Sequence, residues 1–174
     1  LWDSNFTEDE WHGHFVLVKT LELGTGEVTS KKENHISRIW DQGDAGFYGT
    51  FDGRGYTIRN LKAGANGIFN LIVGGTVRNV NFEGVSIIKD NYHFTGLLAG
   101  QSWGNTTIEN ISVKFDTIEW PINNVLTDWA ATGLLIARLS NASGTIFRNV
   151  TIDATGLAIT NALGTEITGV QYQN

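Results

Sequence analysis

Aromatic and acidic side chains that could bind a glycan or a protein gather in three stretches of this 174-residue chain. Tyr92 lies in the first stretch, Trp103 in the second, and Trp120, Asp128 and Trp129 in the third. Aromatic rings stack on the faces of sugars and also anchor protein interfaces. We therefore predict that these five residues form a ligand-binding surface. The same rings could instead pack the three stretches against the rest of the fold.

The acids of the chain do not form a pattern typical of catalysis. A glycosidase needs two carboxylates opposed across a groove, about 5 to 9 Å apart, and a lyase needs a base with a charge neutraliser. Here the candidate acids are divided between an early turn, with Asp41, Asp44 and Asp52, and a later stretch, with Asp116, Glu119 and Asp128. We predict no catalytic residue and no cofactor.

Metal binding has two weak candidates. His12 and His14 would share one face of a strand, but two imidazoles without a third ligand make only half of a site. The three aspartates of the early turn could suit calcium, yet aspartates in turns also bind their own backbone. We predict no metal site.

Composition and charge exclude several classes of partner. The net charge is −6 and the pI is about 5.1, so the chain lacks the basic surface that a nucleic acid requires. No apolar run approaches the roughly 18 residues of a membrane span, so we expect no membrane insertion in this segment. With no Met and Leu1 as its first residue, the chain is expected to be processed or part of a larger secreted protein.

A repeated motif must position these residues. It reads Thr-Ile-Arg-Asn-Leu at 57–61, and we call it the Asn motif. Related copies occupy 76–80, 107–111 and 145–150, and a degenerate copy occupies 166–170. The motif asparagines are Asn60, Asn79, Asn110 and Asn149.

The apolar positions around each asparagine indicate a bend. They lie two residues before it, one after it and three after it, whereas a single strand alternates with a period of two. Asparagine readily adopts the left-handed backbone conformation that a bend can use. We predict two short strands per motif, repeated as a right-handed parallel β-helix (β-solenoid), an all-β fold. The four asparagines would form an internal, inaccessible ladder with a spacing of roughly 4.8 Å, and Glu109 would lie between Arg78 and Arg148.

The chain is expected to form one domain over residues 1–174. Residues 1–14 would be an N-terminal cap with a short helix, and residues 15–174 would form the coils. Phe15 to Leu21 is predicted to be a strand, and glycine-led strands are expected at Gly67, Gly96, Gly133 and Gly156. Insertions at 83–95 and 114–132 should emerge on one side of the solenoid, where such proteins often bind ligands.

The stretch Phe-Tyr-Gly-Thr-Phe-Asp-Gly-Arg-Gly-Tyr-Thr-Ile-Arg-Asn-Leu, with the later Gly-Leu-Leu and Thr-Ile-Glu-Asn-Ile sequences, resembles the GLUG-motif family of bacterial secreted and surface proteins. The resemblance runs from about Phe15 to Val170. It implies coils of a right-handed parallel β-helix and a secreted or cell-surface location. It transfers no catalytic residue.

The sequence thus predicts a non-catalytic extracellular module for adhesion, which binds a glycan or a surface protein through aromatic loops on one face. An alternative is head-to-tail self-association into a filament or surface layer through an open C-terminal rung. A polysaccharide-degrading enzyme is a second alternative.

Overall fold

The structure, a computed structural model, describes residues 12–23, 46–64, 67–88, 94–120, 131–140 and 144–161, without the side chains of residues 120 and 159–161. These residues form two sheets in which every strand pair is parallel. The described part of the chain contains no α-helix. The prediction of an all-β chain with parallel strands is confirmed.

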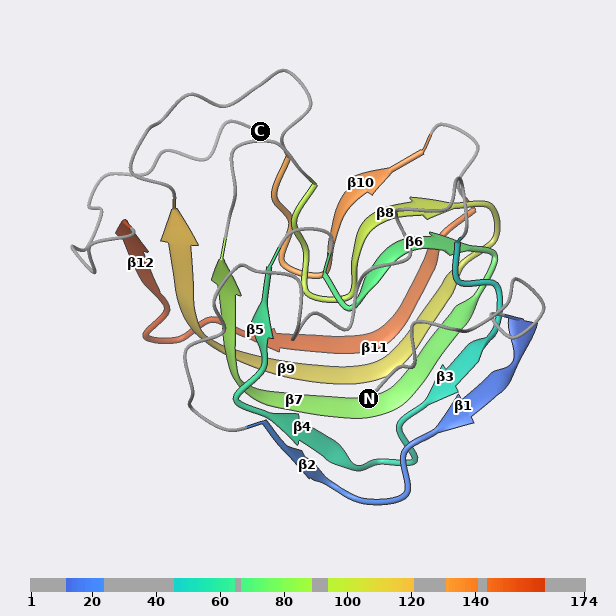
Figure 1. Ribbon diagram of the computed structural model, residues 1–174, viewed down its shortest axis with the longest axis horizontal. Coiled ribbons are helices and arrows are strands. Elements are labelled where there is room, and N and C mark those ends of the chain that lie inside the picture. The colour runs from blue at the N-terminus through green and yellow to red at the C-terminus, as the bar shows by residue number, and fades with distance from the viewer. Residues whose placement is uncertain are drawn as a thin grey trace.

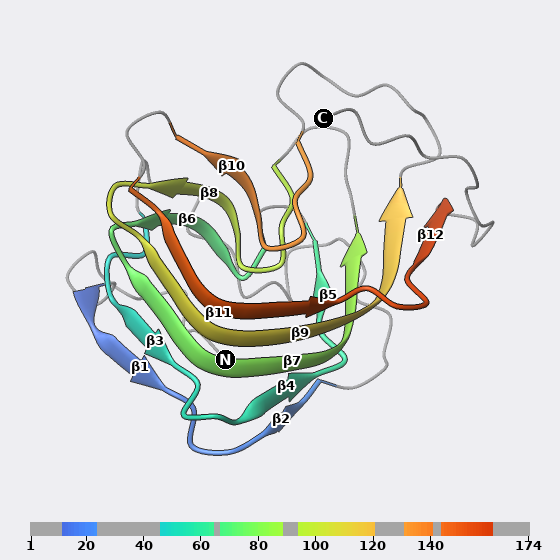
Figure 2. The ribbon, with the colours of Figure 1, turned by 180° about the vertical axis from the view of Figure 1, so that it is seen from behind.

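The larger sheet has nine strands. They are β1 (His14–Val16), β2 (Leu21–Glu22), β3 (Thr50–Asp52), β4 (Thr57–Arg59), β5 (Lys62–Ala63), β7 (Thr76–Ile88), β9 (Thr107–Trp120), β11 (Ile146–Asp153) and β12 (Ala158–Asn161). The smaller sheet has the order β10 (Ile136–Leu139), β8 (Ala99–Trp103), β6 (Phe69–Val73). The long strands β7, β9 and β11 follow a curved course, and the smaller sheet lies across from them on the far side of the core (Figure 1, Figure 2).

Two extra residues cause the curvature of β7. Its inward side chains are Val77, Val80, Phe82, Val85 and Ile87, each at most 1% exposed. A flat strand would present every second residue to the core, so the steps from 77 to 80 and from 82 to 85 each contain one additional residue. Both steps contain a left-handed residue, Asn79 with a φ of 54° and Gly84 with a φ of 67°. We call these positions the first and the second bend.

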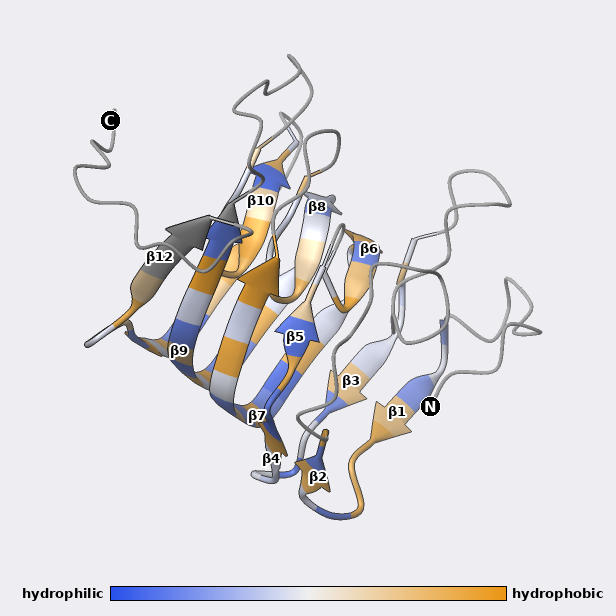
Figure 3. Ribbon diagram, turned by 60° about the vertical axis from the view of Figure 1, so that its left-hand side comes forward, coloured by the Kyte–Doolittle hydropathy of each residue, from blue (hydrophilic) through white to orange (hydrophobic). Residues whose placement is uncertain are grey.

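The strand β9 repeats this arrangement one step along the stack. Val77, Val80 and Phe82 are paired in register with Ile108, Ile111 and Val113, which are equally buried. The alternation of apolar and polar residues along β7 and β9 is visible in Figure 3. Stacked apolar layers of this kind supply the core, and each fully buried aliphatic or aromatic side chain contributes about 1.5–3 kcal/mol.

Aromatic rings fill the core of the early strands. Phe47 stacks on Phe69 with the ring centroids 4.4 Å apart, and Phe51 meets Phe69 edge-on at 6.0 Å. Phe15 from β1 lies 5.9 Å from Phe47. The stretch 46–55, with its aromatics between glycines, thus supplies rings to the interior.

Several sequence predictions about the elements need correction. Residues 15–21 do not form one strand, because β1 ends at Val16 and β2 begins at Leu21. The insertion predicted at 83–95 begins later, because β7 continues to Ile88 after the second bend. The insertion predicted at 114–132 also begins later, because β9 continues to Trp120. The apolar alternation resumes after the second bend of β7, and the motif-based prediction therefore ended the strands too early.

The fourth glycine-led strand is also placed differently. Gly67, Gly96 and Gly133 precede the three strands of the smaller sheet, as expected. Gly156 instead precedes β12, which pairs with β9 in the larger sheet. Residues 1–11, which hold most of the predicted cap, lie outside the described residues, and His14 already belongs to β1.

Candidate functional site

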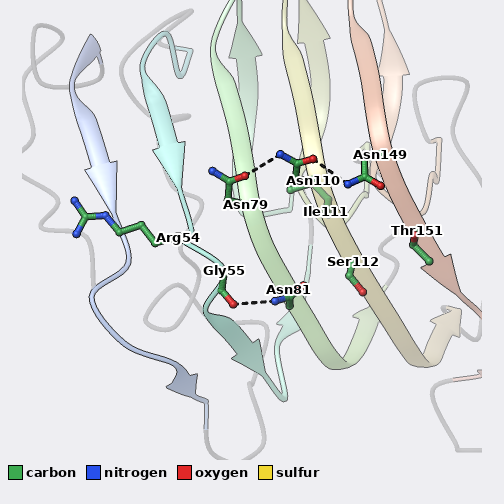
Figure 4. Close-up of a pocket in the computed structure, with 9 residues that line it drawn as sticks. All are labelled: Arg54, Gly55, Asn79, Asn81, Asn110, Ile111, Ser112, Asn149 and Thr151. Atoms are coloured by element: carbon green, nitrogen blue, oxygen red, sulfur yellow. Dashed lines mark hydrogen bonds between the residues drawn. The ribbon is translucent and has the colours of Figure 1, made fainter.

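The first bend carries a hydrogen-bonded row of side-chain amides. Asn79, Asn110 and Asn149 have φ angles of 54°, 53° and 48°. The Nδ2 atom of Asn149 donates to Oδ1 of Asn110, and Nδ2 of Asn110 donates to Oδ1 of Asn79, both over 2.9 Å. Figure 4 shows these two bonds between neighbouring strands. We call the three residues the Asn ladder, and they are three of the four predicted members.

The fourth predicted member, Asn60, is not in the ladder. Its strand β4 pairs with Asn81–Glu83 of β7, so Asn60 lies at the second bend, beside Gly84. A glycine has no amide to continue a ladder there. The place beside Asn79 belongs instead to Gly53, and Asn79 donates its Nδ2 hydrogen bond to Oδ1 of Asp52 over 3.0 Å.

The Asn ladder faces outward, which corrects the prediction of an internal, inaccessible position. Asn79 is half-buried, whereas Asn110 and Asn149 are exposed. The reason is that the left-handed residue is the extra residue of the bend. The apolar residues on either side of it turn inward, and its own side chain projects from the outer surface.

A column of alternating charges runs beside the ladder. Asp52, Arg78, Glu109 and Arg148 are successive partners across β3, β7, β9 and β11, so Glu109 lies between two arginines as predicted. The Nε atom of Arg78 lies 3.0 Å from Oδ2 of Asp52, and Nη1 of Arg148 lies 3.9 Å from Oε2 of Glu109. The Arg148–Glu109 pair is largely exposed, and such pairs stabilise a fold by only about 0–1 kcal/mol, whereas Asp52 is buried.

Asp52 is the most heavily hydrogen-bonded acid of this column. Burial raises its pKa, but hydrogen bonds from the backbone N–H of Arg54, the amide of Asn79 and the guanidinium of Arg78 outweigh burial. The pKa of Asp52 therefore lies below its ordinary value of 3.8.

A second column of alternating charges lies beside the second bend, where Glu83 directly precedes Gly84. Arg59 binds Glu83 and Glu22, each over 2.7 Å, and these hydrogen bonds raise the pKa of Arg59. The column continues with Lys114 and its partner Asp153. The pKa of Asp153 is lowered, first by the backbone N–H of Thr155 and more weakly by Lys114.

Between the two charged columns runs a shallow groove on the outer face, which we call the outer groove. One part of it, about 560 Å³, is lined by Arg54, Gly55, Asn79, Asn81, Asn110, Ile111, Ser112, Asn149 and Thr151 (Figure 4). An adjoining part, about 530 Å³, shares Asn81 and Ser112 and adds Glu83, Lys114, Asp116 and Asp153 among others. The first part is a regular array of amides and hydroxyls that repeats from strand to strand.

Comparison with known proteins gives one match. The family described as the M26 IgA1-specific metallo-endopeptidase N-terminal region matches residues 6–114. The chain belongs to this family. No curated protein and no solved structure matches the chain.

The matched part of this M26 N-terminal region holds much of the outer groove. Arg54, Asn79, Asn81, Asn110 and Ser112 lie inside the matched residues, whereas β11, with Asn149 and Thr151, follows them. The resemblance to the GLUG-motif family stays a prediction.

The predicted aromatic surface of the M26 N-terminal region is only partly described. Trp103 is the last residue of β8, and its exposed fraction is 38%. Trp120 is the last residue of β9, while Tyr92, Asp128 and Trp129 lie outside the described residues. Trp103 does not line either part of the outer groove.

Metal and membrane features are not found among the described residues. They contain no cluster of three or more His, Cys, Asp or Glu side chains suited to hold a metal ion. His12 stacks on the ring of Tyr48, with the centroids 4.5 Å apart. None of the described segments is a helix long and apolar enough to cross a membrane.

The groove residues outside the Asn ladder were not predicted, although the sequence holds a signal for three of them. Asn81, Ser112 and Thr151 each follow a ladder asparagine by two residues, and each is small and polar. A column of short polar residues on the outer face is the pattern that could have revealed the groove. Arg54 has no such repeat to mark it.

Proposed function

We propose that this chain is a non-catalytic recognition module of a secreted or cell-surface metallo-endopeptidase, and that its outer groove binds a glycan on the protein substrate. The chain would be a right-handed parallel β-helix, in which the smaller sheet and the two segments of the larger sheet form the walls of each coil. The stacked parallel registers and the two bends support this fold, and parallel crossovers are right-handed in nearly all proteins.

The observation that carries the proposal is the chemistry of the outer groove. Asn79, Asn81, Asn110, Ser112 and Thr151 present amide and hydroxyl groups along one shallow surface. An amide has two N–H groups and two acceptor lone pairs, so each asparagine keeps hydrogen-bonding capacity beyond its bonds within the protein. Each hydroxyl can donate or accept, so the array can match the hydroxyl groups of a sugar chain. A peptide ligand is favoured less, because anchor side chains need apolar pockets and Ile111 is the only apolar residue in this part of the groove.

The family supports a location and a substrate for the module. Its description names immunoglobulin A1 (IgA1) as the specific target of the metallo-endopeptidases whose N-terminal regions it contains. A recognition module beside a peptidase domain would raise the local concentration of the glycoprotein near the catalytic site. For this chain we therefore propose IgA1, or a related glycoprotein, as the partner.

The test uses the whole 174-residue chain as a purified protein. It should bind immobilised human IgA1 saturably, and enzymatic removal of the glycans should weaken the binding at least about tenfold, a difference of about 1.4 kcal/mol. Equal binding to intact and deglycosylated IgA1 would overturn the glycan-binding role. Cleavage of IgA1 by the chain alone would overturn its assignment as non-catalytic.

End-to-end association is favoured less than glycan binding, although β11 offers an edge for it. Among the described strands β11 pairs only with β9, and it exposes 44% of Phe147 and 39% of Ile152. The charges oppose this arrangement. Glu22 and Asp153 are the two end members of the second charged column, where they pair with Arg59 and Lys114. A second copy stacked in register would therefore place Asp153 of one chain against Glu22 of the next. Sedimentation velocity should accordingly show a monomer.

A further inference from the structure

Arg54 occupies a backbone position that arginine rarely adopts. The N–H of Tyr56 donates to the carbonyl of Gly53 over 2.9 Å, which closes a four-residue turn. Its two central residues, Arg54 and Gly55, have φ angles of 51° and 79°. Turns with two positive φ angles favour Asn, Asp and Gly, since a longer side chain strains the left-handed conformation. A strained residue on the surface points to a role for its side chain.

The guanidinium of Arg54 is free to meet a ligand. The neighbouring acid, Asp52, already accepts hydrogen bonds at both oxygens: at Oδ1 from Asn79 and the backbone of Arg54, and at Oδ2 from Arg78. In contrast to Arg59, Arg78 and Arg148, Arg54 has no ion pair with any described residue. It is exposed at the edge of the outer groove, and its side chain extends away from the Asn ladder (Figure 4).

Arg54 is also the only charged residue that lines the first part of the outer groove. The other lining groups are the neutral amides and hydroxyls described above and Ile111. A neutral array with one cation at its edge, which has no ion pair within the described part of the chain, matches a polyhydroxylated ligand that carries a single negative group. Guanidinium binds carboxylate through two parallel hydrogen bonds, which adds geometric specificity to the charge.

We propose that Arg54 binds the carboxylate of an acidic sugar, while the amides and hydroxyls of the groove bind the sugar hydroxyls. This inference rests on the proposed function and adds to it the class of sugar. It also explains why a strained arginine stands where a glycine or an asparagine would fold at least as well.

The test compares two immobilised probes, the trisaccharide 3′-sialyllactose and the disaccharide lactose, which differ by one acidic sugar. The wild-type chain should bind 3′-sialyllactose at least about tenfold more tightly, as expected for a charge-assisted contact. Arg54→Asn should reduce this ratio to about one, because Asn tolerates the left-handed turn but carries no charge. Arg54→Lys should retain part of the preference, since the charge remains without the two-pronged geometry.

Two controls separate binding from stability and from net charge. The melting temperature of Arg54→Asn should equal or exceed that of the wild-type chain, because the substitution relieves backbone strain. Lys19→Asn removes one positive charge from an exposed site that does not line the groove, and it should leave the ratio unchanged.

Three results would overturn the inference: an undiminished ratio in Arg54→Asn, an equal loss in Lys19→Asn, or equal wild-type binding to both probes. Each of these leaves the proposed function intact as long as the wild-type chain binds intact IgA1 more tightly than deglycosylated IgA1. Failure of the wild-type chain to bind any glycan would overturn both.

Discussion

The side-chain amide of Asn110 donates a hydrogen bond to Asn79 over 2.9 Å, and it accepts an equivalent bond from Asn149. Each amide therefore donates toward the preceding strand, from Asn149 to Asn110 and from Asn110 to Asn79. The ladder ends where Asn79 donates to the carboxylate of Asp52. A carboxylate accepts hydrogen bonds without donating, so it terminates such a ladder better than a further amide would.

Substitution of Asn110 separates two contributions to stability, the side-chain hydrogen bonds of the Asn ladder and the left-handed backbone conformation. Asn110→Ala should lower the free energy of unfolding by about 2–3 kcal/mol, because it removes two hydrogen bonds and places alanine in the left-handed region. Asn110→Gly also removes the two hydrogen bonds, but glycine adopts the left-handed conformation readily. Its loss of unfolding free energy should therefore be about 1 kcal/mol smaller than that of Asn110→Ala. Urea unfolding of both variants measures the difference, and equal losses would show that the backbone conformation contributes nothing.

The close approach of Gly53 to the first bend makes a second prediction. A Cβ atom at Gly53 would lie 2.6 Å from the carbonyl oxygen of Asn79, and closer still to the side chain of Val80. Gly53→Ala should therefore cost about 3 kcal/mol, at the upper end for overpacking. Gly156→Ala is the control: it has a φ of 75° but no atom within 4 Å of the added Cβ, and should cost only about 1 kcal/mol. Similar melting temperatures for the two variants would contradict this account of Gly53.

The lowered pKa of Asp52 predicts a pH dependence. A carboxyl group whose folded pKa lies below its unfolded value stabilises the fold above the unfolded pKa, here about 3.8, and loses this contribution as the pH falls through the folded pKa. Asp52→Asn should be about 1–2 kcal/mol less stable than wild type at pH 7, since it weakens charge-assisted hydrogen bonds. Thermal unfolding from pH 7 to pH 2 should show the two proteins converging below about pH 4. Parallel curves would mean that Asp52 titrates alike in the folded and unfolded chains.

Bulk in the outer groove should block binding without affecting folding. Ser112 is exposed and lies in both parts of the groove, so Ser112→Trp should weaken IgA1 binding at least about tenfold while changing stability by less than about 0.5 kcal/mol. Trp103→Ala tests the aromatic surface predicted from the sequence. If the groove is the binding site, Trp103→Ala binds IgA1 like the wild-type chain. The opposite pattern would assign recognition to the loop at Trp103.

The sequence predicted the local geometry of the bends better than their position in the stack. The spacing of apolar residues around Asn79, Asn110 and Asn149 contains the extra residue of the first bend, and the order of motifs placed Glu109 between two arginines. Asn60 was misplaced because β7 has left-handed residues at both of its bends, Asn79 at the first and Gly84 at the second, and Asn60 lies beside Gly84. A short motif cannot distinguish them, since both bends follow a short strand with the same alternation.

The outer groove was harder to predict for a physical reason. Aromatic residues attract attention in a sequence, but in 46–55 the phenylalanines are buried in the core. Short polar residues such as Ser112 and Thr151 carry no individual signal, and they become a surface only when the parallel register stacks them. Arg54 is notable for its left-handed backbone and for having no ion pair with a described residue, and neither property can be read from the sequence.

The alternating charges of the two columns have an evolutionary consequence. Deletion of the sequence repeat that contains β7 would bring Asp52 against Glu109 on one side of the groove and Arg59 against Lys114 on the other. Removal or duplication of two neighbouring repeats would instead preserve the alternation of charges in both columns. Like charges opposite one another destabilise a sheet. A pair of neighbouring repeats is therefore the unit whose addition or removal leaves both columns alternating in charge.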